Sequence, residues 1–88
     1  MKIHDIKAQP KSFQDLWDDL KTHEVRINDR GYEAGDLLLI REIASPGSPV
    51  FTGRIIVAFV TNLTSGGSFG LPANLCVMSV KTLLKTKE

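Results

Sequence analysis

One short stretch of the chain concentrates the side chains that could do chemistry. It begins at Lys21 and ends at Arg30, and it brings cations, carboxylates and small hydrogen-bonding groups close together. Guanidinium groups can bind phosphate or a base edge through two parallel hydrogen bonds, an ammonium group supplies a point charge, and a carboxylate can orient these cations or accept from a base amino group. The candidate residues in this stretch are Lys21, Thr22, Glu24, Arg26, Asn28, Asp29 and Arg30.

A strand over residues 21–28 would position these groups. Because side chains alternate between the two faces of a strand, Glu24 and Arg26 share one face, and His23 and Val25 share the other. We expect the face with Val25 to meet the core and the face with Glu24 to line a cleft. The alternative is an ordinary solvated strand, in which neighbouring ion pairs contribute little to stability.

The pattern around this strand predicts a small α+β fold. A first strand is expected over residues 3–8, and Pro10 suits the first turn of a helix whose apolar stripe ends near Leu20. Four further strands are predicted, over residues 21–28, 37–40, 51–60 and 75–80. The expected core residues are Phe13, Leu16, Trp17, Val25, Leu39, Ile56 and Val77.

The connections complete this prediction. With one helix available, a mostly antiparallel, curled sheet is the economical arrangement, and Gly53 marks an expected bulge or bend. Residues 61–74 are rich in Gly, Ser, Asn and Pro, which predicts a long, mobile loop. Residues 81–88 predict a frayed, charged tail. The length fits one domain over residues 1–88.

Composition narrows the function classes. The formal net charge is +1, so an anionic partner must be held by a local cluster of cations. Cys76 is the single cysteine, which excludes an intrachain disulfide. No apolar run is long enough for a membrane span or a signal peptide, so we expect a cytoplasmic protein. His4, His23 and Cys76 lack the spacing of metal ligands, and we expect neither a metal nor a cofactor.

The ordered motifs resemble a known family. The ASCH domain carries a Gly-x-Lys-x-x-Glu-x-Arg signature, and Lys21, Glu24 and Arg26 match it, with Asp19 in place of the Gly. The resemblance is closer to a small bacterial and phage family of ASCH-related domains of unknown function. It extends over nearly the whole chain, through the segments 21–26, 28–30, 35–36, 41–42 and 51–54.

This resemblance implies a PUA-like curled antiparallel β-barrel of about five strands with one packed helix. It also implies a polar cleft, lined by the motif strand, that binds RNA or a nucleotide-like ligand, and it adds Arg54 to the candidate binding residues. Two positions depart from the pattern. Asp19 puts a carboxylate at a turn near the cleft, and His23 replaces an aromatic residue on the expected core face.

Two other functions stay open. Some compact ASCH proteins hydrolyse the amide of a modified nucleoside, and Lys21 matches their catalytic Lys. The position of their catalytic Thr holds Glu24 here, Thr22 stands elsewhere, and a carboxylate beside Lys21 would favour the charged amine, which is a poor base. The third reading is a phage or host protein-interaction module that uses the loop 61–74. A deep pocket at Lys21 would favour a small ligand or an enzyme, and an open basic groove would favour RNA. The sequence leaves the oligomeric state undetermined.

Overall fold

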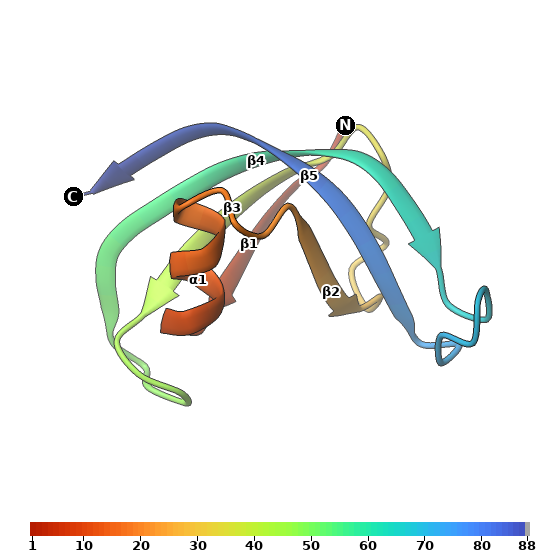
Figure 1. Ribbon diagram of the computed structural model, residues 1–88, viewed down its shortest axis with the longest axis horizontal. Coiled ribbons are helices and arrows are strands. Elements are labelled where there is room, and N and C mark those ends of the chain that lie inside the picture. Colours follow the sequence, from red (N-terminus) through yellow and green to blue (C-terminus); the bar gives the residue numbers. More distant parts are fainter. Residues whose placement is uncertain (88) are drawn as a thin grey trace.

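The computed structural model describes residues 1–87 as one curled sheet of five strands with a single helix (Figure 1). The elements follow the chain as β1 (Ile3–Ala8), α1 (Pro10–Trp17), β2 (His23–Ile27), β3 (Leu37–Ile43), β4 (Phe51–Ser65) and β5 (Leu75–Lys87). The strand order in the sheet is β1-β3-β4-β5-β2. β1 runs parallel to β3, and the other neighbouring strands are antiparallel. The predicted small α+β fold with a curled, mostly antiparallel sheet is confirmed.

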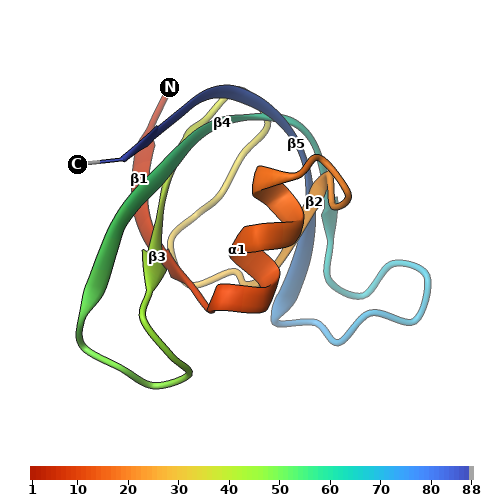
Figure 2. The ribbon, with the colours of Figure 1, turned by 60° about the vertical axis from the view of Figure 1, so that its left-hand side comes forward.

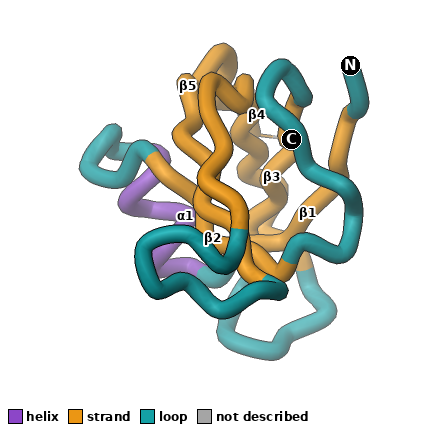
Figure 3. Tube along the Cα trace, turned by 90° about the vertical axis from the view of Figure 1, so that its right-hand side faces the viewer, coloured by secondary structure: helices purple, strands orange, loops and turns teal. Residues whose placement is uncertain are grey.

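The sheet curls into a half-barrel because its long strands bend. β4 and β5 arch over α1, which lies on the concave side of the sheet between the two edge strands β1 and β2 (Figure 2). Viewed from the side, the strands form one continuous layer with α1 on one side of it (Figure 3). The register of β3 with β4 shifts between Arg41 and Ile43, opposite Gly53, whose positive φ of 95° few other residues tolerate. The bend predicted at Gly53 is therefore present.

The core lies between α1 and the concave face. An eight-residue helix is marginal on its own, so tertiary packing must stabilise it. Phe13 and Leu16 supply that packing, at 0% and 1% exposure. The other large side chains that are essentially fully buried come from the strands and include Ile6, Leu38, Ile40, Ile56, Val60 and Met78.

The helix ends earlier than its apolar stripe predicts. α1 stops at Trp17, and Asp19 then adopts a left-handed conformation with φ of 58°. The backbone N–H groups of Leu20 and Lys21 both donate to the carbonyl of Asp15, which closes the helix end. This turn takes Leu20 out of helical phase and leaves it exposed, so its predicted place on the buried stripe is wrong.

Two strands are longer than composition suggests. β4 continues to Ser65, so only residues 66–74 of the predicted loop 61–74 form a loop, and β5 continues to Lys87 where a frayed tail was predicted. The two strands pair from Arg54 opposite Lys87 to Ser65 opposite Cys76. Backbone hydrogen bonds along this long hairpin override the turn-like composition and the charge of these segments. The final residue of the predicted tail, Glu88, lies outside the described residues.

Three predicted core residues lie on the outer face of the sheet. Val25 is 48% exposed, and Leu39 and Val77 are only half-buried. Leu39 lies between the fully buried Leu38 and Ile40, so the alternation of β3 was assigned to the wrong face. Strands that are apolar on both faces give no periodic signal by which to choose between them. Trp17 packs against the core and is partly buried.

The connection between β2 and β3 is anchored by a buried acid. Asp36 is 2% exposed, and its Oδ2 lies 2.8 Å from Nε2 of the buried His4. Burial alone would raise the pKa of Asp36, but hydrogen bonds with His4 and with the backbone N–H groups of Lys2 and Glu33 outweigh it, so the pKa is lowered. This anchor fixes the start of β3 beside β1.

Candidate ligand-binding site

β2 carries the motif residues because of its pairing with β5. Glu24 lies opposite Met78 and Arg26 lies opposite Cys76, and both partners are fully buried. The face of β2 with Glu24 and Arg26 therefore continues the core face of the sheet, while Val25 points away from it. This is the reverse of the predicted core face, and it leaves Glu24 at 3% exposure.

The buried carboxylate of Glu24 is compensated by two cations. Its Oε1 lies 3.2 Å from Nζ of Lys21, and its Oε2 accepts a hydrogen bond of 3.0 Å from Nε of Arg26. Lys21 also donates a hydrogen bond of 2.6 Å to Oγ of Ser12 on α1. A charge this deeply buried is stable only when paired, so Glu24 holds both cations in place.

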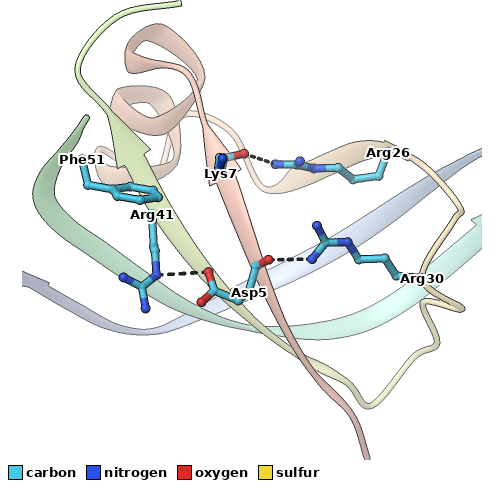
Figure 4. Close-up of a pocket in the computed structure, with 6 residues that line it drawn as sticks. All are labelled: Asp5, Lys7, Arg26, Arg30, Arg41 and Phe51. Atoms are coloured by element: carbon cyan, nitrogen blue, oxygen red, sulfur yellow. Dashed lines mark hydrogen bonds and ion pairs between the residues drawn. The ribbon is translucent and has the colours of Figure 1, made fainter. Parts of the chain in front are cut away.

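Arginine side chains bridge the gap between the two edge strands, which we call the seam. Nη2 of Arg26 donates to the carbonyl of Lys7 at 2.7 Å, and Nη1 of Arg30 donates to the carbonyl of Asp5 at 2.6 Å (Figure 4). Both acceptors belong to β1, whose other edge pairs with β3. Side chains thus contact the backbone across the seam, where a closed barrel would have paired strands.

Two neighbouring hollows lie along the seam. One hollow, which we call the inner cavity because it adjoins α1, is open to solvent and has a volume of about 340 Å³. It is bounded by β2, the end of β1 and the start of α1, and its polar lining includes Lys7, Gln9, Ser12, Lys21, Glu24 and Arg26. The outer pocket, of about 590 Å³, is lined by Asp5, Lys7, Arg26, Arg30, Arg41 and Phe51 (Figure 4). Lys7 and Arg26 border both hollows, so the two are adjacent.

The fold brings some of the predicted binding residues together around the two hollows. Lys21, Glu24 and Arg26 line the inner cavity, and Arg26 and Arg30 line the outer pocket. Asp29 borders a smaller hollow of about 220 Å³ beside Arg26, Arg30 and Tyr32.

Two predicted residues have local structural contacts. Thr22 is exposed, lines neither the inner cavity nor the outer pocket, and accepts a backbone hydrogen bond from Val80. Asn28 accepts the backbone N–H of Tyr32 through its side-chain oxygen and so shapes the turn after β2.

Arg54 lies apart from both hollows. It donates from Nε and Nη2 to the two carboxylate oxygens of Glu42, at 2.9 and 2.8 Å, and from Nη2 to Gln14 of α1. Its guanidinium carbon lies 5.1 and 4.9 Å from the ring centroids of Phe13 and Trp17. The hydrogen bonds from Arg54 lower the pKa of Glu42 below its usual value. These contacts join α1 to the sheet.

Sequence reasoning missed Lys7, Ser12, Arg41 and Phe51. Alternation with buried neighbours indicates that Asp5 and Lys7 share an exposed face, but it does not say what lies beside them. Lys7 is aligned with Arg41 only because β1 pairs in parallel with β3, which is a non-local feature. Ser12 reaches Lys21 because α1 crosses the concave face.

Within residues 1–87, no group of three or more His, Cys, Asp or Glu side chains is placed to hold a metal ion. Burial raises the pKa of the Cys76 thiol, which favours its unreactive protonated form. The one described helix, α1, is too short to cross a membrane.

Fold and site together define a small α+β half-barrel with a basic seam between its edge strands. The chain belongs to the family described as Domain of unknown function (DUF3850), whose model matches residues 3–80. It is also similar to the "Uncharacterized 12.9 kDa protein in GpA 3'region" of Escherichia phage P2, with 40% identity over 63 residues. The match covers 72% of this chain and 55% of the phage protein, so the chain spans about half the length of that relative.

Proposed function

We propose that this protein binds RNA or a nucleotide-like ligand in the inner cavity. The observation that carries the proposal is the fixed pair of cations there: Lys21 and Arg26 are both held by the buried carboxylate of Glu24. Arg26 is further anchored at the carbonyl of Lys7. Cations that are already positioned lose little conformational entropy when they bind an anionic group.

The chemistry of the cavity suits a nucleotide better than an apolar molecule. Arg26 has N–H groups left to donate to a phosphate or to an acceptor on a base edge, and Lys21 contributes a compact positive charge. Gln9 and Ser12 add neutral hydrogen-bonding groups to the lining. The motif shared with ASCH domains, whose PUA-like fold commonly serves RNA binding, supports the same proposal.

Amide hydrolysis on a modified nucleoside is a second candidate. The 2.6 Å contact between Lys21 and Ser12 favours it, since a serine beside an amine is one arrangement of an activated nucleophile. Glu24 opposes it, because its carboxylate forms an ion pair with Nζ of Lys21, the amine that would have to act as the base. Thr22, the threonine within the motif, does not line the inner cavity. Binding without hydrolysis is therefore the better-supported function.

A protein-interaction module is the third candidate. Phe69, in the loop 66–74, is 97% exposed and would be a natural anchor for a partner chain. The loop carries no cation, so it would not serve nucleic acid.

A titration with two matched variants tests the proposal. Labelled single-stranded RNA and nucleotides are titrated against wild type, Arg26→Gln and Lys85→Gln. Lys85 is a suitable control because it lies on β5, pairs with Asp19 and borders neither the inner cavity nor the outer pocket. We expect micromolar affinity for wild type and Lys85→Gln, and a loss of about tenfold or more for Arg26→Gln.

Folding must be separated from binding in this test. Arg26→Gln leaves the buried Glu24 with one cation, so the double variant Glu24→Gln/Arg26→Gln is measured alongside, with thermal unfolding of each protein. Equal affinity in wild type and the folded Arg26 variants would refute binding at this cavity. Release of acetate from an acetylated nucleoside by wild type, lost in Lys21→Gln, would favour the enzyme instead.

A further inference from the structure

The outer pocket has features that the proposed inner site does not use. β1 runs between two groups of side chains: Arg26 and Arg30 reach it from β2 and the turn that follows, and Arg41 and Phe51 flank it from β3 and β4 (Figure 4). Lys7 belongs to β1 itself. Three of these residues, Lys7, Arg41 and Phe51, lie outside the stretch from Lys21 to Arg30.

The pocket holds unbalanced positive charge. Four of its lining residues are cations and one, Asp5, is an anion, although the whole chain carries a formal net charge of +1. Arg41 is paired with Asp5 at 3.0 Å, and Arg26 is paired with Glu24. Within residues 1–87, no carboxylate lies within ion-pair distance of Lys7 or Arg30. Positive charge concentrated in a hollow attracts anionic groups.

The donors in the pocket are already oriented. Arg26 and Arg30 are each anchored by one nitrogen to a carbonyl of β1, and these carbonyls belong to residues two apart on the same strand edge, Lys7 and Asp5. A guanidinium group has five N–H donors in a rigid plane, so anchoring one leaves others in fixed positions. Two such groups side by side match the several acceptor oxygens of a phosphate.

An aromatic ring lies across β1 from these donors, beside Arg41 and Lys7 (Figure 4). Phe51 is 42% exposed, and its ring centroid lies 5.6 Å from the guanidinium carbon of Arg41 and 5.9 Å from Nζ of Lys7. A half-exposed ring beside cations is the arrangement by which proteins stack a base while they hold the adjacent backbone phosphate. An inorganic anion or an acidic side chain would make no use of the ring.

The two hollows are adjacent through shared residues. Lys7 and Arg26 border both hollows, so a group bound between these two residues would lie at the boundary of the inner cavity and the outer pocket. Volumes of about 340 and 590 Å³ leave room for one nucleotide unit in each.

We infer that the outer pocket binds the phosphodiester and base of the nucleotide next to the one in the inner cavity. The ligand is then a single-stranded oligonucleotide of at least two residues, and a free nucleoside or mononucleotide fills the site only partly. This inference rests on the proposed function, which it deepens by naming the ligand class.

A ligand series against separate variants of the two hollows tests the inference. The series comprises a nucleoside, its 5′-monophosphate, the dinucleotide, and RNA and DNA hexamers of the same base. Of the inner cavity and the outer pocket, Arg30→Gln and Arg41→Gln alter only the outer pocket, and Lys21→Gln alters only the inner cavity. Lys85→Gln is the control. The ion pair of Arg41 is half-exposed, so its loss should leave folding intact. Affinities are measured by calorimetry, with thermal unfolding of every variant.

We expect the dinucleotide and hexamers to bind wild type at least tenfold more tightly than the nucleoside. Arg30→Gln and Arg41→Gln should each lower the affinity for the hexamers by about tenfold and leave the affinity for the nucleoside unchanged. Lys21→Gln should lower the affinity for every ligand in the series. A difference between the RNA and DNA hexamers would assign the sugar preference within the same inference.

The contrary outcomes are distinct. If the dinucleotide binds no more tightly than the monophosphate and the outer variants match wild type, the outer pocket is not part of the site, while the proposed function stands. If no member of the series binds wild type, both proposals fail. If a glutamate hexamer binds wild type as tightly as the RNA hexamer does, and Arg30→Gln no longer binds it, the pocket is a site for acidic peptides. That result would overturn the inference.

Discussion

Arginine side chains hold this half-barrel together in two regions, and their partners differ between the regions. Where α1 packs on the sheet, which we call the closed side, Arg54 binds both carboxylate oxygens of Glu42, the side chain of Gln14 and the faces of two aromatic rings. At the seam, Arg30 binds one backbone carbonyl, and Arg26 binds one carbonyl and one carboxylate oxygen. Arg54 has the carboxylate of Glu42 to itself and binds both of its oxygens, whereas Arg26 shares Glu24 with Lys21, and Arg30 forms no ion pair within residues 1–87. The seam therefore keeps net positive charge.

The difference shows how one residue type can serve structure in one place and binding in another. A guanidinium that binds both oxygens of one buried carboxylate and lies over two aromatic rings stabilises the fold and has little charge left for a ligand. One that is anchored by a neutral carbonyl is held in position while its charge stays available. Variants of the two regions should therefore have different effects. Substitutions on the closed side should lower stability, and substitutions at the seam should lower affinity for the ligand.

The largest effect is expected in the core beneath the closed side. Leu16→Ala should lower the free energy of unfolding by about 2–5 kcal/mol, because Leu16 is 1% exposed and its removal leaves a cavity. Val25→Ala, on the exposed face of β2, should cost less than about 1 kcal/mol. Urea unfolding of both variants makes the comparison. Equal losses would mean that the face of β2 that carries Val25 is buried in solution.

A smaller loss of stability is expected from Arg54→Gln, and a still smaller one from Arg30→Gln. Arg54→Gln should cost about 2–3 kcal/mol, because it leaves the buried carboxylate of Glu42 without its cation. Arg30→Gln should cost less than about 1 kcal/mol, since it removes one hydrogen bond at the surface. The same unfolding experiment decides this, and a greater loss in Arg30→Gln would contradict the division of roles.

The pH dependence of stability should report the Arg54 contact. The pKa of Glu42 is held below its ordinary value of 4.5 chiefly by the hydrogen bonds from Arg54. A lowered pKa in the folded state stabilises the protein above pH 4.5, and this contribution is lost as the pH falls through the lowered value. Wild type should therefore exceed Glu42→Gln in stability at neutral pH, with the gap narrowing below pH 4.5. A gap that is constant with pH would show that Glu42 is not held by its charge.

The smallest effect concerns the salt dependence of binding at the seam. Each phosphate contacted on a single strand contributes about 0.7 to the slope of log affinity against log salt. Arg30→Gln should therefore reduce the slope for an RNA hexamer by about 0.7, and Arg54→Gln, if folded, should leave it unchanged. Titrations across a range of salt concentrations would measure both slopes. An unchanged slope in Arg30→Gln would place the phosphate elsewhere.

Local pattern predicted much of the fold. The order of strand, helix and four strands follows from alternation, the apolar helix stripe and turn residues, and each of these elements is present. The errors fall where local signals compete with pairing. Residues 61–65 and 81–87 resemble a loop and a tail in composition but are strand, because both belong to the hairpin of β4 and β5. There the first segment pairs with residues 76–79 and the second with residues 54–59. Leu20 matched the helix stripe, but the left-handed Asp19 turns the chain first.

The site was predictable as far as one strand could reveal it. Alternation places Glu24 and Arg26 on one face of β2, and both line the inner cavity. Arg54 was assigned by a motif, but the position of α1 gives it other partners. Lys7 and Arg41 carry no local signal, because they become neighbours only through the parallel pairing of β1 with β3.

The topology also governs when the seam can form during synthesis. Both of its edges come from the first 27 residues, whereas β3, β4 and β5 follow one another as an antiparallel meander. β2 emerges early from the ribosome, but its partner is the stretch Leu75–Ser79 of β5. Until that stretch has been translated, Glu24 lacks the strand that buries it, and Arg26 lacks the support that aims it at β1. The ribosome must therefore complete most of the meander before the nascent chain has a seam at all.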